Sequence, residues 1–211
     1  MKRDKITKGQ IILRVTALTV LLCLCLGLYS CSEGDEAYSE KQFDENGIFV
    51  SEGMSYDELK DYYSRDKDIS LNDAEGKLAQ MDITGEEEST YRVAVKKVKS
   101  SDKYTPYIEF YLETSEAEDS WVMEKIRKAG VYATKDQKEA VFLGTLACWL
   151  REDNVIEYSL YGDIFDTAAI KGSVACKDES DKDATELHYL VDTEVKNKDR
   201  EEVYVHEFIK L

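Results

Sequence analysis

The residues with the clearest chemical capability lie close to the N-terminus. The quartet Leu28-Tyr29-Ser30-Cys31 ends an apolar run over residues 15–28, which follows five basic residues, namely Lys2, Arg3, Lys5, Lys8 and Arg14. A basic start, an apolar core and a small residue before the cleavage point are typical of a secretory signal. Leucine three positions before a cysteine and serine directly before it match the lipobox of bacterial lipoproteins, although Tyr29 is bulkier than the residue usual there. We therefore expect residues 1–30 to be a lipoprotein signal peptide and the thiol of Cys31 to carry a diacylglyceryl group.

A second interpretation of the same segment is an uncleaved signal anchor. Residues 11–29 come close to the roughly 20 residues that a membrane-spanning helix needs. In both interpretations the basic end stays in the cytoplasm, because positive residues flank the cytoplasmic side of membrane segments. Everything after Cys31 is then expected on the extracytoplasmic face of the cell membrane. With cleavage, the acyl chains on Cys31 would make the lipid bilayer the first partner, since two chains anchor a protein stably.

The charge of the exported part restricts its other partners. The whole chain has a net charge of −16, and the segment before Cys31 holds five basic residues and one acidic residue, so the remainder has a net charge of −20. Nucleic acids and anionic head groups would repel this part, because their recognition needs clustered lysine or arginine. We interpret the one dense basic cluster, Lys96, Lys97 and Lys99, as the solvated side of a strand and turn. We expect an unknown envelope protein or glycan as partner and no nucleic acid.

Motifs of common catalytic sites are missing from the sequence. It contains no Gly-x-Ser-x-Gly, no glycine-rich phosphate loop and no His-Glu-x-x-His. Carboxylates are so abundant that an exported hydrolase using paired Asp or Glu stays an alternative without a specific signal. An accessory subunit of a membrane machine is a further alternative. The sequence favours a non-catalytic binding or interaction module with no cofactor.

Two groups of residues contain metal-ligand types. His188 and His206, with Glu186 and Glu207, could bind zinc if their strands faced one another, but the expected pairing displaces the two histidines by three positions. Five nearby carboxylates offer oxygen ligands for calcium without the glycine and ligand order of an EF-hand loop; they are Asp178, Glu179, Asp181, Asp183 and Glu186. We interpret the histidines as surface strand residues and the acidic stretch as a solvated connection, so no metal site is predicted.

Three of the five cysteines remain after removal of the signal. Cys148 and Cys176 could form a disulfide outside the cell, where such bonds persist. Both lie in strands expected to be two apart in one sheet, about 9.6 Å from each other and beyond disulfide reach. Placement in facing sheets would permit the bond, and two buried free thiols are the other interpretation.

The rest of the chain predicts an acidic tether and a β-rich domain. Residues 31–54 are acidic and poor in apolar side chains, as in a tether, and residues 55–211 are expected to form the extracytoplasmic domain. Ser55 with Glu58 fits a capping box, and Ser70 before Asp73 begins a second pattern, so two short amphipathic helices are expected. Later segments favour about eight strands, over residues 91–96, 107–112, 121–132, 141–150, 155–161, 170–176, 187–195 and 203–209.

The order of these segments determines the expected fold class. Residues 121–132 would also suit a helix, and we interpret them as a strand. Strands at short spacing without a βαβ rhythm predict a mainly β fold, with α+β character on the N-terminal side. We expect an antiparallel β-sandwich or barrel preceded by the two short helices.

Tyrosine is abundant, with fourteen residues, and it supplies contact area at protein and sugar surfaces. We assign three tyrosines to strands, namely Tyr91, Tyr158 and Tyr161. Six others fall in the tether, the first helix or a strand entry and are expected to be more exposed; they are Tyr38, Tyr56, Tyr62, Tyr63, Tyr104 and Tyr107.

Several stretches resemble a known group of exported proteins. They are Ile69-Ser70-Leu71, Ala74, Leu78, Met81-Asp82, Tyr107-Ile108-Glu109-Phe110-Tyr111-Leu112-Glu113, Ile156-Glu157-Tyr158 and Gly162-Asp163. Over about residues 69–165 this pattern resembles an uncharacterised β-rich domain family of secreted proteins and lipoproteins from Gram-positive Firmicutes. The Lys135-Asp136-Gln137-Lys138 turn departs from the longer Asn/Gly/Ser-rich loop of that group. The resemblance implies a mostly β exported domain and no catalytic residue, because the family has no established activity.

Overall fold

The computed structural model describes most of the chain after residue 40. The described residues are 41–85, 89–99, 103–118, 120–135, 138–152, 154–169, 174–179, 184–191, 195 and 200–211. The expected signal peptide, Cys31 and Tyr38 lie outside this part of the chain. No helix within the described part is long and apolar enough to span a membrane.

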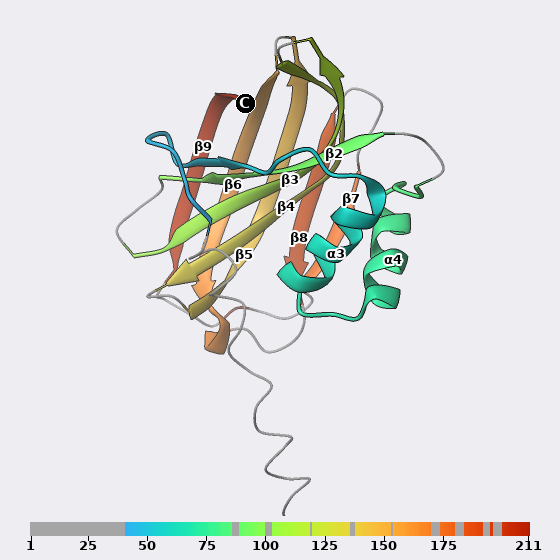
Figure 1. The fold of residues 1–211 in the computed structure, drawn as a ribbon. Coiled ribbons are helices and arrows are strands. Elements are labelled where there is room, and N and C mark those ends of the chain that lie inside the picture. Colours follow the sequence, from blue (N-terminus) through green and yellow to red (C-terminus); the bar gives the residue numbers. More distant parts are fainter. Residues whose placement is uncertain are drawn as a thin grey trace, which may run out of the picture. The chain divides into compact units, whose positions relative to one another are not determined.

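The described residues form a mainly antiparallel β fold with two helices on its N-terminal side, which confirms the expected fold class (Figure 1). The helices are α3 (Tyr56–Asp66) and α4 (Leu71–Gln80), and the strands are β1 (Ile48–Val50), β2 (Thr90–Lys97), β3 (Thr105–Ala117), β4 (Ser120–Lys135), β5 (Lys138–Arg151), β6 (Val155–Asp166), β7 (Val174–Asp178), β8 (Thr185–Val191) and β9 (Glu201–Lys210). A short 3-10 helix, Thr167–Ala169, follows β6. The strand interpretation of residues 121–132 is confirmed, since they lie within β4.

The nine strands form one open sheet that folds back on itself. Its path is β1-β2-β3-β4-β5-β6-β9, and β8 pairs with both β5 and β7. β4 pairs with β5 only from Ala133↔Ala140 to Lys135↔Lys138, and β8 then takes the same edge of β5 from Gly144↔Tyr189 to Cys148↔Thr185. The sheet therefore separates into a half with β1 to β4 and a half with β7, β8, β5, β6 and β9. Figure 1 shows the first half crossing in front of the second.

The main hydrophobic core lies between these two halves. The first half contributes Ile108, Phe110 and Leu112 from β3, while the second contributes residues such as Leu146 and Leu160. All five side chains are fully buried. Burial of apolar area on both sides of one interface stabilises the folded sheet.

The two helices cover the other face of the first half. Leu59 and Leu78, from α3 and α4, pack in a second cluster with Val93 and Val95 of β2. β2 is therefore buried on both faces, whereas the alternation in its sequence predicts one buried face. The expected capping box begins α3, because Ser55 accepts a hydrogen bond from the Glu58 backbone and Glu58 accepts one from the Ser55 backbone.

The folded domain begins earlier than the expected boundary at residue 55. β1 pairs with β2 from Ile48↔Lys96 to Val50↔Ala94. Ile48 and Val50 pack on the main core, while Phe49 packs on the helix cluster together with Phe43. Residues 41–54 thus belong to the domain and not to the acidic tether. A three-residue strand is too short for its alternation to be recognised in the sequence.

Candidate functional site

The outward face of β5, β6, β8 and β9 carries most of the exposed large apolar side chains in the described part of the chain. In the described part of the chain, seven large apolar side chains are exposed. Four of them belong to this face: Tyr161 at 57%, Leu190 at 54%, Tyr204 at 75% and Phe208 at 63%. Large apolar side chains gathered on one exposed face mark candidate interaction surfaces. We call the part formed by Tyr161, Tyr204, His206 and Phe208 the aromatic face.

The strand register explains why these residues gather. Along β6, even-numbered residues such as Tyr158 and Leu160 point into the core, so Tyr161 points outward. Tyr161 pairs with Tyr204 of β9, and their rings meet edge to face with centroids 6.2 Å apart. The His206 and Phe208 rings meet in the same way at 5.7 Å. Two edge-to-face contacts order rings that would otherwise be mobile in solvent.

A serine, a histidine and a carboxylate also meet on the aromatic face. Ser159 Oγ and His206 Nδ1 share a hydrogen bond of 2.7 Å, and His206 Nε2 lies 3.4 Å from Glu157 Oε1. An acyl-transfer site further needs free donors to stabilise an oxyanion. β6 lies between β5 and β9, and both neighbours occupy its backbone donors. The contacts with Ser159 and Glu157 therefore orient His206 on the surface.

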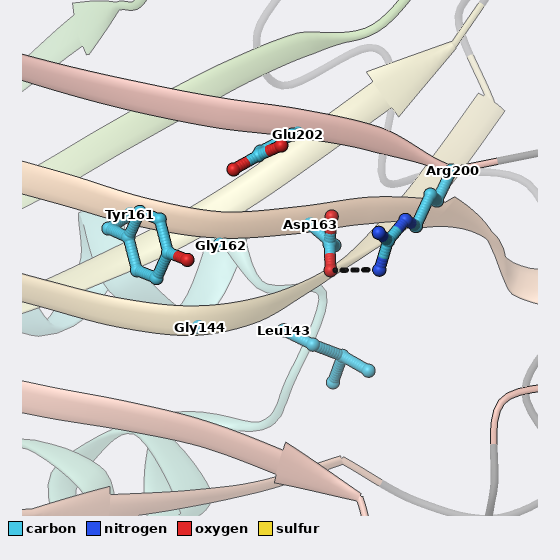
Figure 2. A pocket seen from close by; sticks show the side chains of 7 residues that line it. All are labelled: Leu143, Gly144, Tyr161, Gly162, Asp163, Arg200 and Glu202. Atoms are coloured by element: carbon cyan, nitrogen blue, oxygen red, sulfur yellow. Dashed lines mark hydrogen bonds and ion pairs between the residues drawn. The ribbon is translucent and has the colours of Figure 1, made fainter.

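A small hollow adjoins the aromatic face (Figure 2). It has a volume of about 220 Å³, and its lining residues are Leu143, Gly144, Tyr161, Gly162, Asp163, Arg200 and Glu202. Arg200 Nη1 and Asp163 Oδ2 form an ion pair of 3.2 Å at its margin, drawn as a dashed line in Figure 2. Pockets for small ligands usually have about 300–1,000 Å³, so this hollow suits a single side chain or sugar ring.

Two glycines bring the strands beneath this hollow close together. Gly144 of β5 pairs directly with Gly162 of β6. A Cβ on Gly144 would lie 2.6 Å from the Gly162 Cα, and a Cβ on Gly162 would lie 2.8 Å from the Gly144 Cα. On the core side the Phe142 and Tyr189 rings fill the space, with centroids 5.5 Å apart. Only glycine fits both positions without a backbone shift.

The structure separates the two histidines that the sequence offers as zinc ligands. His188 lies on β8 and His206 on β9, with β5 and β6 between them. Three strand spacings correspond to about 14 Å, too far for a shared metal ion. His188 Nδ1 instead lies 3.1 Å from Thr145 Oγ1, and its Nε2 lies 3.2 Å from Glu186 Oε1. Glu207 is on the core side of β9, where it accepts a hydrogen bond of 2.8 Å from the Tyr158 hydroxyl.

The acidic stretch over residues 178–186 contains the residue types that bind calcium. Where the structure describes it, its carboxylates form ion pairs with basic side chains. Asp178 forms an ion pair of 3.1 Å with Lys128, and Glu179 pairs with Lys177. Asp181 and Asp183 lie outside the described residues. Within the described part of the chain no group of three or more potential ligands could hold a metal ion.

The two domain cysteines are free thiols and do not form a disulfide with each other. Cys148 is buried on β5 and Cys176 is exposed on β7, with β8 between them. Cys148 pairs with Thr185 of β8, whereas Cys176 pairs with Tyr189 of the same strand. The two cysteines are therefore also displaced from each other along the strand direction. Burial raises the pKa of the Cys148 thiol to about 12, which keeps it protonated and unreactive.

The expected exposure of tyrosines is wrong for several of them. Tyr63 and Tyr104 are buried, and Tyr56, Tyr62 and Tyr107 are partly buried. Conversely, the sequence does not single out Tyr161 or Tyr204 as exposed, and both are. The alternation of apolar residues along the two strands does indicate that these tyrosines point outward. Tyr161 is out of phase with Ile156, Tyr158 and Leu160, and Tyr204 is out of phase with Val203 and Ile209.

Sequence reasoning also missed a buried ionic cluster between α3 and the sheet. Glu109 of β3 is fully buried, and it lies 2.8 Å from Lys67 Nζ and accepts a hydrogen bond of 3.1 Å from the Tyr111 hydroxyl. Lys67 also contacts Asp66 at 2.8 Å, and Asp66 contacts Lys41 at 2.7 Å. Burial, followed by the charge of Glu109, raises the pKa of Tyr111 well above its usual value. Because Lys67 directly follows α3 and Glu109 lies on β3, these contacts hold the helix on the sheet.

Comparison of the chain with protein-family models, with curated proteins and with solved structures gave no match.

Proposed function

We propose that this chain is a lipid-anchored, extracytoplasmic binding module of the cell envelope. Diacylglyceryl chains on Cys31 would hold it on the outer face of the membrane, and the β-rich domain would present its aromatic face to another envelope component. The signal sequence with its lipobox supports the anchoring. We also propose that the domain is related to the β-rich domains of secreted proteins and lipoproteins from Gram-positive Firmicutes.

The single observation that carries the binding role is the aromatic face. Tyr161, Tyr204 and Phe208 are each more than half exposed, although apolar side chains of this size are usually covered. Their edge-to-face contacts and the Ser159–His206 hydrogen bond hold them in one arrangement before a ligand arrives. Preorganised rings lose little conformational entropy on binding, which favours recognition.

The chemistry of the face limits the partner. Aromatic rings stack on the apolar faces of sugars and pack against apolar protein side chains. Glu157, Asp163 and Glu202 border the rings, and the part of the chain after residue 30 has a net charge of −20. An anionic polymer would be repelled, so the proposed partner is a neutral or basic protein or glycan of the envelope.

Side-chain truncation on the face tests this role. The full-length chain and its Tyr161→Ser variant would be compared for co-sedimentation with purified cell-wall glycan and for cross-linked capture of proteins from solubilised envelopes. Tyr161→Ser removes a ring from the face without touching the core, and we expect it to reduce the captured component at least about tenfold, as for an energetically dominant interface residue.

Matched controls come from other surfaces. Leu71→Ser and Val122→Ser each remove an apolar side chain of similar exposure, 51% and 45%, from α4 and β4. Both variants should bind like the wild type. The binding role is refuted if Tyr161→Ser retains every component that the wild type captures, or if the controls lose binding to the same extent.

A further inference from the structure

The last strand of the sheet has an edge that no described strand occupies. β9 is ten residues long and ends the strand path, and its only strand partner in the described part of the chain is β6. Such an edge presents a row of backbone donors and acceptors that can pair with another strand. Its length distinguishes it from β1, the three-residue strand at the other end of the path.

The register shows which residues direct their backbone groups to this edge. The Leu211 backbone N–H donates to the Asn154 carbonyl at 3.0 Å, so this directly opposed pair is hydrogen-bonded. Hydrogen-bonded and non-hydrogen-bonded pairs alternate along an antiparallel ladder. The odd-numbered residues of β9 therefore bond to β6, and the even-numbered residues point their N–H and C=O groups outward. The even-numbered residues are also those with exposed side chains, namely Glu202, Tyr204, His206, Phe208 and Lys210.

The sequence of these five residues is complementary to itself. In an antiparallel pair of β9 strands centred on His206, Glu202 of one copy lies opposite Lys210 of the other, and Tyr204 lies opposite Phe208. The two-fold axis repeats both contacts. Among the described residues neither Glu202 nor Lys210 has an ion-pair partner within its own chain, although both are exposed. Opposite charges and aromatic pairs in facing positions stabilise neighbouring strands.

The alternative registers lack this complementarity. Outward-pointing residues can pair only with outward-pointing residues, so a shift must be by two positions. A shift one way places Arg200 opposite Lys210 and Glu202 opposite Phe208. A shift the other way places Tyr204 opposite Lys210 and His206 opposite Phe208. Only the register centred on His206 pairs both charges and both aromatic rings.

We propose that two copies of this chain associate through antiparallel pairing of their β9 strands about a two-fold axis at His206. The second half of each sheet then continues into that of the other copy, and the two aromatic faces become neighbours on one surface. This association does not depend on membrane anchoring or on an envelope ligand.

Disulfide trapping tests the pairing and its register. Facing residues in a hydrogen-bonded antiparallel pair have Cα atoms about 5.5 Å apart, which lies within disulfide reach. In the full-length chain with Cys176→Ser, the His206→Cys substitution should yield a reduction-sensitive band of twice the monomer mass under mild oxidation. The parent without an introduced cysteine should not yield it. Neither should Ser159→Cys, because two further strand spacings separate the two copies of that residue by about 15 Å.

Exchange of the facing charges tests which residues meet. In the His206→Cys background, Glu202→Lys or Lys210→Glu alone would create two like-charge contacts, and we expect each to lower the rate of cross-linking about tenfold. The double variant reverses both charges and should restore the wild-type rate. Glu75→Lys, an exposed change on α4, should leave it unaltered.

The outcomes distinguish this pairing from non-specific contact between copies. The proposal is overturned if His206→Cys does not cross-link, if Ser159→Cys cross-links equally, or if the double charge exchange fails to restore the rate. Thermal unfolding of each variant establishes that it is folded. Binding by Tyr161→Ser is a separate readout, since Tyr161 lies on β6 and not at the edge.

Discussion

At the scale of single residues, the ionic cluster around Glu109 has the largest expected effect on stability. Glu109 is fully buried, and Lys67 is the cation in contact with it. Removing one member of a buried pair leaves the other charge uncompensated, which costs more than the pair itself contributes. The sequence predicts a strand at this position but gives no sign of the cluster, because Lys67 and Glu109 are 42 residues apart.

Lys67→Met should therefore destabilise the protein strongly. We expect the free energy of unfolding to fall by about 3–5 kcal/mol, measured by urea denaturation with tryptophan fluorescence. Lys60→Met is a matched control, since its partner Asp57 is exposed on the same helix, and its midpoint should hardly change. Equal effects of the two substitutions would contradict the role of the buried pair.

The same variant should change how stability depends on pH. Burial acts to raise the pKa of Asp66, but Lys67 and Lys41 outweigh it and hold that pKa below the ordinary 3.8. A carboxylate with a lowered folded-state pKa stabilises the protein above its unfolded pKa, and this contribution disappears as the pH falls through the folded value. In the wild type the loss therefore occurs below pH 3.8, and in Lys67→Met the pKa of Asp66 rises, so this loss should become smaller. Urea midpoints across this range would show an unchanged profile if Lys67 did not act on Asp66.

At the scale of elements, local patterns predicted what depends on neighbours in sequence. The two helices begin at Ser55 and Ser70 as their capping residues indicate, and period-two alternation predicts most strands. The pairing of β8 with β5 could not be predicted, because it depends on β4 leaving that edge of β5 after Ala140. For the same reason the sequence could not show that β5 and β6 lie between His188 and His206.

The glycine pair of β5 and β6 permits a test at this scale. In Gly144→Ala the new Cβ would collide with the Tyr161 carbonyl oxygen and approach the Gly162 Cα to 2.6 Å. Because backbone atoms cannot move aside as a flexible side chain does, we expect destabilisation of about 1–3 kcal/mol in urea denaturation.

Gly76→Ala provides the opposite expectation. A Cβ there has nothing within 4 Å, and the residue lies inside α4. Alanine is preferred over glycine in a helix interior, so this variant should gain up to about 1 kcal/mol. A Gly144→Ala variant as stable as Gly76→Ala would show that β5 and β6 do not approach as closely as the structure has them.

At the scale of the whole molecule, we propose an N-terminal lipid anchor and a β domain with an exposed aromatic face. The sequence could predict the fold class, since composition and periodicity are properties of the chain alone. The aromatic face needed the register of β6 with β9, which places Tyr161 opposite Tyr204. Alternation could therefore predict which individual side chains point outward, but it could not predict that these side chains meet on one surface.

The most direct test of the proposed role is lipid attachment at Cys31. Cells producing the full-length chain would be grown with labelled palmitate, and the N-terminal peptide of the purified protein would be analysed by mass spectrometry. We predict label in the wild type and in Cys176→Ala, a lipopeptide that starts at Cys31, and loss of both in Cys31→Ala. An unlabelled wild type, or a Cys31→Ala product with unchanged label, mass and membrane fractionation, would contradict the proposal.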